Sequence, residues 1–272
     1  MPCDSGSRYV DIDDVACEEL VIDDVAIDFL EIDDVCLWRK ADPPGEIRFD
    51  VPGNYTWITP SGYDSVNVCM VGGGGSGRGD SDGDGGHYAG GGYAGEEFSK
   101  DLQVEEEITI SITVGAGGEP VLIDPSQNGN PGGSSSFGGF GTVSGGAGGI
   151  CCGGYPGNEG PGPSGCGGGG YKDGKRRDTN EAYGSGGQAS SFGNGGDANY
   201  TDDTDGFPGG VGAGGGAFYT TYGTISGRKS GAGGRGEVRV RWGSKTHRKF
   251  TQVKVSEMTP EELEKYKIRK VS

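Results

Sequence analysis

Apolar and acidic positions recur in a short repeat along the first 42 residues. The tetrapeptide Ile-Asp-Asp-Val begins at Ile12, Ile22 and Ile32, and a finer period of five residues lies beneath it. Positions i and i+2 of a strand face the same side, so each pentad predicts a three-residue strand and a two-residue turn. Aspartate suits such a turn because its carboxylate binds nearby backbone groups. A helix is disfavoured, because a five-residue period does not match 3.6 and the apolar residues are mostly β-branched.

This pattern predicts a tight meander or short solenoid with an apolar seam and carboxylates at its corners. It carries no chemistry, so we interpret residues 1–42 as an acidic β-repeat module for attachment. The ten-residue repeat occurs three times. We interpret this number as a match between the module and the end of a threefold fibre, and hence as a trimeric context. The candidate attachment residues are Ile12, Ile22, Ile32, Asp13, Asp23 and Asp33.

Longer segments of alternating apolar and polar residues follow a hinge at Pro43-Pro44-Gly45. Because such segments bracket the glycine-rich stretch at both ends, the chain must return to the same sheet to pair them. We therefore expect one small β-domain over residues 43–242. Its predicted strands cover 47–51, 55–60, 66–71, 108–114 and 237–242.

Residues 243–272 form a basic tail with one helical signal. Thr259 is a typical N-cap, Pro260 suits the first helical position, and two glutamates follow in the first turn. The pattern predicts a short helix that ends near Lys270. We expect the basic charge of this tail to pair with the acidic repeats or with a neighbouring subunit.

Composition changes the picture of the middle of the chain. The 272 residues include 61 glycines and 13 prolines, and the net charge is −17, a combination typical of disordered chains. The glycines, however, fall in runs such as 72–75, 145–149 and 212–216, separated by aromatic and polar segments. Glycine lets backbones approach closely, so polyproline-II-like runs can pack side by side through backbone contacts. We expect an ordered polyglycine array, with a flexible linker as the alternative.

The predicted fold is thus mainly β. It consists of a short N-terminal β-repeat module, a small β-domain with an inserted glycine-rich, polyglycine-II-like array, and a short C-terminal helix.

The chemistry available to the chain is limited. It has two histidines, and its seven cysteines form no C-x-x-C pair. Neither a Ser/His/Asp set nor a phosphate-loop motif is present, so we expect no enzymatic activity. The acidic charge repels nucleic acid, and no apolar run reaches the ~20 residues that span a bilayer, so we expect no membrane insertion. We interpret most cysteines as small buried residues, with late disulfides as the alternative.

Several motifs resemble the glycine-rich domain of bacteriophage tail-fibre and tail-tip proteins. They are Phe49-x-Val51-Pro52-Gly53-x-Tyr55-x-Trp57, Val66-x-Val68-x-Met70-Val71 before Gly72 to Gly75, Ile112-x-Val114-Gly115-Ala116-Gly117-Gly118, and the segments 132–138 and 233–240. The resemblance covers about residues 47–242 and is similar in style to the distal adhesins of T-even-type phages. The acidic module and the basic tail depart from that pattern, so the mode of attachment does not carry over.

The resemblance implies a virion protein at the tail or tail-fibre tip, synthesised in the host cytoplasm. Its implied partners are other virion tail or fibre proteins and a host surface receptor, either a protein or a polysaccharide. A purely structural virion protein, such as a tail or capsid decoration, is the alternative.

Five segments between glycine runs are predicted to be exposed loops: 119–131, 155–166, 171–183, 197–208 and 218–230. Exposed loops on a rigid scaffold commonly carry recognition, and tyrosine offers contact area and a hydroxyl at low entropic cost. The aromatic receptor candidates are Tyr155, Tyr171, Tyr183, Tyr200, Phe207, Phe218, Tyr219 and Tyr222. Gap-filling between glycine strands is the alternative role for about half of them.

Two charged clusters complete the candidates. Lys175, Arg176 and Arg177 could contact phosphates or sugar acids on a cell surface, but we favour a solvated loop as their explanation. Asp80, Asp82 and Asp84 resemble the start of a calcium-binding loop, but Gly91 stands where such a loop has its bidentate glutamate. We therefore expect no cofactor, with calcium as a weak possibility beside a plain acidic turn.

Overall fold

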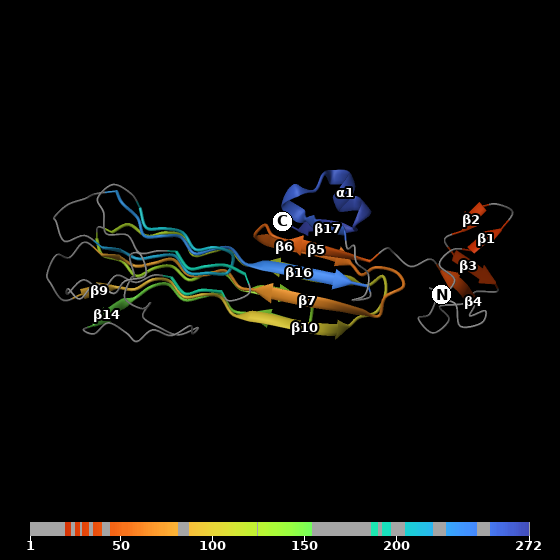
Figure 1. The fold of residues 1–272 in the computed structure, drawn as a ribbon, viewed down its shortest axis with the longest axis horizontal. Helices are drawn as coiled ribbons and strands as arrows, with labels where there is room; N and C mark the ends of the chain where they lie inside the picture. Colours follow the sequence, from red (N-terminus) through yellow and green to blue (C-terminus); the bar gives the residue numbers. More distant parts are fainter. Residues whose placement is uncertain are drawn as a thin grey trace.

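A computed structural model describes residues 20–22, 25–27, 29–32, 35–39, 44–80, 87–123, 125–153, 186–189, 192–196, 205–219, 227–243 and 251–271. In this part of the chain two five-stranded sheets face each other as a β-sandwich (Figure 1). The mainly β fold with one short C-terminal helix is as predicted.

Sheet 1 has the strand order β10-β7-β16-β5-β17, and sheet 2 has the order β13-β12-β11-β6-β18. The neighbours in both sheets are antiparallel except β17 and β5, which are parallel. The strands of sheet 1 are β5 (Gly45–Phe49), β7 (Ser65–Val71), β10 (Glu97–Gln103), β16 (Glu237–Trp242) and β17 (Thr251–Lys254). Those of sheet 2 are β6 (Gly53–Ile58), β11 (Thr109–Val114), β12 (Ser135–Phe137), β13 (Gly141–Val143) and β18 (Ile268–Val271).

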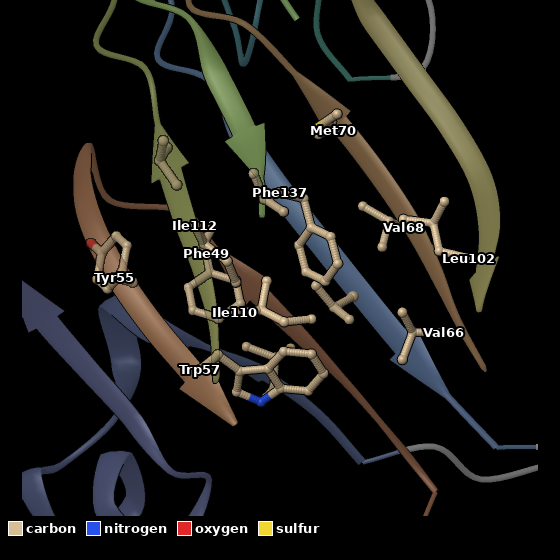
Figure 2. Close-up of a cluster of buried hydrophobic side chains, with 14 of the residues drawn as sticks. Phe49, Tyr55, Trp57, Val66, Val68, Met70, Leu102, Ile110, Ile112 and Phe137 are labelled. Carbon is tan, nitrogen blue, oxygen red and sulfur yellow. The ribbon is translucent and has the colours of Figure 1, made fainter. Parts of the chain in front are cut away.

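The core lies between the two sheets and follows directly from the alternation in the sequence. In β7 the even-numbered residues Val66, Val68 and Met70 are buried, and in β11 Ile110 and Ile112 are buried. Large side chains fill the centre, as Figure 2 shows: Phe49, Tyr55, Trp57, Leu102 and Phe137. The five predicted strands that bracket the glycine-rich stretch are therefore confirmed.

The basic tail extends both sheets. Strand β17 pairs with β5 and β18 pairs with β6, so the sandwich continues beyond residue 242. Between them lie η1 (Val255–Glu257) and α1 (Pro260–Lys265). Thr259 caps α1 as predicted, in a capping box with Glu262.

The predicted end of this helix near Lys270 is wrong. Lys267 adopts a left-handed φ of 54°, which terminates the helix, and Ile268 is buried as the first residue of β18. The pairing of Ile268 with Trp57 draws the chain into sheet 2. Burial of this isoleucine in the core therefore overrides the helical pattern of the following residues.

The N-terminal repeats form hairpins where the structure describes them. Strands β1 (Leu20–Ile22) and β2 (Val25–Ile27) are antiparallel, as are β3 (Phe29–Ile32) and β4 (Val35–Arg39). Their spacing matches the predicted pentads. The register of β3 and β4 shifts between Leu30 and Glu31, so the repeat is not perfectly regular.

An ion-pair network covers the outer face of sheet 1. The Glu46 carboxylate, 3% exposed, accepts hydrogen bonds from Arg48 (2.8 Å), Arg241 and the Gln252 amide (3.0 Å). Burial alone raises the pKa of Glu46, but the two guanidinium groups outweigh it and hold the pKa below its ordinary value of 4.5. Cys69 also lies on this face; it is half-buried, and its thiol is 3.1 Å from the Ser99 hydroxyl.

The N-terminal segment and the glycine runs join the sandwich at different ends. Gly45, the first residue of β5, pairs with Trp242, the last residue of β16. The glycine runs leave instead from the other end, after Val71 of β7, Val114 of β11 and Val143 of β13. The N-terminal segment and the glycine-rich array are therefore joined to opposite ends of the β-sandwich (Figure 1).

Candidate recognition site

The glycine runs form an ordered bundle that extends from one end of the sandwich, as Figure 1 shows. At its centre lies the run 72–79, here called the central run, which is buried throughout except for the half-buried Arg78. Its N–H groups donate to three antiparallel runs, and every third residue donates to the same run. These bonds of 2.8–3.1 Å go from Gly72, Gly75 and Arg78 to 90–96, from Gly73, Ser76 and Gly79 to 127–133, and from Gly74 and Gly77 to 231–234.

Carbonyl oxygens of the central run accept hydrogen bonds from three further runs that lead away from the sandwich. Gly146 and Gly149 donate to Gly73 and Ser76, Gly215 and Phe218 donate to Gly75 and Arg78, and Gly118 donates to Gly74, at 2.8–3.0 Å. Six described runs thus surround the central run. A repeat of three residues per turn is that of a polyproline-II-type helix, so the prediction of an ordered polyglycine-II-like array is confirmed.

Close backbone approach explains why glycine fills these positions. A Cβ atom at Gly74 would lie 2.0 Å from the Ala213 carbonyl oxygen, and one at Gly75 would lie 2.0 Å from that of Ala147. Real Cβ contacts do not fall below 3.0 Å, so no other residue fits without moving a neighbouring backbone. Buried amides joined by direct hydrogen bonds replace the side-chain core that the composition lacks.

Polar side chains of the central run contact the run 126–130. The Ser76 hydroxyl accepts from the Asn130 N–H (2.8 Å), and the Arg78 guanidinium donates to the Asn128 side-chain oxygen (2.6 Å). Asp80 is fully buried near the far end of the array; it accepts from Ser126 (3.0 Å) and pairs with Arg78 (3.2 Å).

The contacts of Asp80 bear on the possible calcium site. Its two carboxylate oxygens are bound by Ser126 and Arg78, and it is directed into the array. Asp82 and Asp84 lie outside the described residues. Among the residues that the structure describes, no three His, Cys, Asp or Glu side chains are placed to hold a metal ion.

A model of the glycine-rich domain matches residues 50–243. The chain belongs to the glycine-rich domain family. The matched region begins just after β5 and ends just after β16. It contains the described runs of the array and seven of the ten sandwich strands, while β5, β17 and β18 lie outside it. No curated protein matches the chain. In the described part of this glycine-rich domain protein, no helix is long and apolar enough to cross a membrane.

The predicted recognition residues have different environments. Phe207 is 50% exposed on an outer run of the array, as expected of a contact residue. Phe218, predicted to lie in an exposed loop, is instead fully buried. Its N–H donates to the Arg78 carbonyl and it pairs with Gly79, so β15 (Phe218–Tyr219) packs against β8 (Gly79–Asp80). Phe218 therefore fills a gap in the array, and it is not a surface contact.

Most other candidates lie outside the described residues. This holds for Tyr155, Tyr171, Lys175, Arg176, Arg177, Tyr183, Tyr200 and Tyr222, and for Ile12, Asp13, Asp23 and Asp33 of the N-terminal module. Tyr219 lies in β15, and Ile22 and Ile32 end strands β1 and β3.

Sequence reasoning overlooked two exposed residues at the far end of the array. Leu122 is 41% exposed and forms a β-bridge with Lys229, which is also exposed. Both lie in segments predicted to be loops, 119–131 and 218–230. The available signal was the apolar triplet Val121-Leu122-Ile123 within a segment predicted to be an exposed loop. Further strands also lie at this end: β9 (His87–Ala89) pairs with β14 (Cys151–Gly153).

Proposed function

We propose that this protein is a virion structural protein of the tail or tail-fibre tip that binds a host cell-surface receptor. One observation carries the proposal: the N-terminal segment and the polyglycine array join opposite ends of one β-sandwich. This arrangement suits a virion protein that is attached to the tail or fibre at one end and presents loops to the host at the other. Apart from Phe49, the motifs that resemble phage tail proteins lie within the region of the glycine-rich domain.

The rigidity of the array supports the presentation of loops. Each described N–H of the central run donates to a neighbouring run, so the array is held by hydrogen bonds along its length. Loops at its far end are therefore carried on ordered backbone, which lowers the entropic cost of binding. Phe207, exposed on this array, is the described aromatic side chain that best fits a receptor contact.

Attachment is tested by deletion of residues 1–42. Virions assembled in cells that make only the truncated chain should lack this protein, whereas the purified truncated chain keeps the circular dichroism spectrum and protease resistance of its β-sandwich. Incorporation at the wild-type level would refute an attachment role for the N-terminal module.

Receptor binding is tested by exchange of the loop segments between related phages. A changed host range supports adhesion. An unchanged host range, with intact virions, would favour the alternative of a purely structural protein, for which the internally bonded array would serve as a spacer.

A further inference from the structure

An asparagine followed by glycine lies at the surface of the array. The pair Asn128-Gly129 belongs to the run 127–133, which is hydrogen-bonded to the central run. Glycine has no side chain, so its backbone nitrogen is unhindered, and an asparagine before glycine is especially prone to deamidate. Asn128 is exposed, so water reaches its side chain and burial does not protect it.

The reaction at such a pair needs only water. The Gly129 nitrogen attacks the carbonyl carbon of the Asn128 side chain, and the bond from that carbon to the side-chain nitrogen breaks. The proton of the attacking nitrogen leaves with the side-chain NH₂ as ammonia, and a cyclic succinimide remains. Water then opens the ring at one of its two carbonyls, which gives either aspartate or isoaspartate.

In the closed array the attacking nitrogen is held away from the side chain. The Gly129 N–H donates to the Gly149 carbonyl at 2.8 Å. Ring closure requires the peptide plane between Asn128 and Gly129 to rotate toward the side chain, and this rotation breaks that hydrogen bond. Arg78 donates to the Asn128 side-chain oxygen at 2.6 Å, which polarises the carbonyl and favours attack. Protection therefore comes from the backbone and not from the side chain.

Both flanks of the pair are anchored to the central run. Gln127 and Gly79 exchange two backbone hydrogen bonds, of 2.9 and 3.0 Å. The Asn130 carbonyl accepts from the Ser76 N–H at 2.9 Å, and the Asn130 N–H donates to the Ser76 hydroxyl at 2.8 Å. The peptide plane between these anchors therefore turns only when the run separates from its neighbours.

We propose that Asn128-Gly129 is a latent modification site, at which the chain deamidates and forms isoaspartate when the array opens locally. Isoaspartate routes the backbone through the former side-chain carbonyl and so adds one atom to the chain. The residues that follow are then displaced from their partners on the central run, and the run does not close again. The modification thus makes a transient opening of the array permanent.

The test follows deamidation of the full-length protein in ¹⁸O-labelled water by peptide mapping. At neutral pH, Asn128 should react at least about thirtyfold more slowly in the native chain than in the same chain unfolded in urea, which corresponds to about 2 kcal/mol of opening free energy. Equal rates in the native and the unfolded wild-type chain would overturn the proposal, and this comparison does not depend on any variant.

Two glycine variants form a matched pair. A Cβ atom at Gly148 would lie 1.9 Å from the Gly129 carbonyl oxygen, so Gly148→Ala separates the two runs and should speed deamidation of Asn128 at least about tenfold. A Cβ atom at Gly139 meets nothing within 4 Å, so Gly139→Ala should react at the wild-type rate. Equal rates in the two variants would also overturn the proposal.

The permanent opening is tested after reaction in urea and return to native buffer. Hydrogen exchange measured by mass spectrometry should show that chains with isoaspartate do not regain protection in 127–133. The control is Asn128→Asp taken through the same cycle, which carries the new charge without the added backbone atom and should regain protection. Equal protection of the two forms would refute the permanent opening.

Discussion

Replacing Gly75 by alanine probes the packing of the array most directly. Its added Cβ would lie 2.0 Å from the Ala147 oxygen and 2.4 Å from the Ala147 carbonyl carbon. Reaching the 3.0 Å limit of real Cβ contacts requires a backbone shift of about 1 Å. The same oxygen accepts from the Tyr93 N–H at 2.8 Å, and that bond does not survive such a shift.

The cost has two parts. Overpacking of a filled interior costs about 1–3 kcal/mol. An amide left without its partner in the array costs about 1–3 kcal/mol more. We therefore expect Gly75→Ala to destabilise the array by about 2–6 kcal/mol, a range summed from these two contributions. Most of the core side chains of the sandwich lie in its strands, outside the glycine runs, and should retain their packing.

Hydrogen exchange measured by mass spectrometry is the appropriate assay, because it reports the array and the sandwich separately. Peptides that cover 72–79 and 90–96 should lose protection in Gly75→Ala, while those of β7 and β11 keep most of theirs. The control is Gly139→Ala, where an added Cβ meets nothing within 4 Å; its effect should stay within about 0.5 kcal/mol. Equal protection of 72–79 in both variants would refute close packing as the reason for glycine.

Three further changes test other parts of the fold. Glu46→Gln removes a carboxylate whose pKa is lowered by Arg48 and Arg241. The urea midpoint of the wild type should therefore exceed that of the variant by its full margin at pH 7, and the margin should shrink as the pH falls below about 4.5. A constant difference in midpoint from pH 7 to pH 3 would contradict the ion pairing. Ser76→Ala leaves the Asn130 N–H without its acceptor and should cost about 1–3 kcal/mol, seen as faster exchange of that amide in NMR spectra. Thr259→Ala removes the capping box and should cost about 1 kcal/mol of local stability, measured by exchange in 260–266, whereas unchanged exchange would show that packing alone holds α1.

Side-chain alternation made the sandwich predictable from the sequence. The predicted strand at 237–242 coincides with β16, and the predicted strand at 66–71 is β7 without its first residue, because both alternate between core and solvent. The tail was harder to predict. Strand β18 has one buried residue, Ile268, followed by exposed ones, so the sequence carries no periodic signal for it.

Neighbour relationships in the array leave no comparable trace in the sequence. Glycine has no side chain whose pattern could show which runs pack together, although the runs themselves indicated an ordered array. Phe218 illustrates the difficulty: an aromatic residue next to a glycine run is equally compatible with an exposed loop and with a gap in the array. Only the pairing of β15 with β8 decides that it is buried.

Hydrogen bonds that repeat every third residue constrain how this protein can change in length. Adding three residues to a run advances it by one full turn, about 9.3 Å, and keeps each N–H aimed at the same neighbour. Adding one or two residues rotates every later N–H toward a different neighbour. Inheritable changes in the reach of the array should therefore come in whole turns shared by adjacent runs, whereas the segments that join the runs can vary freely in length and composition.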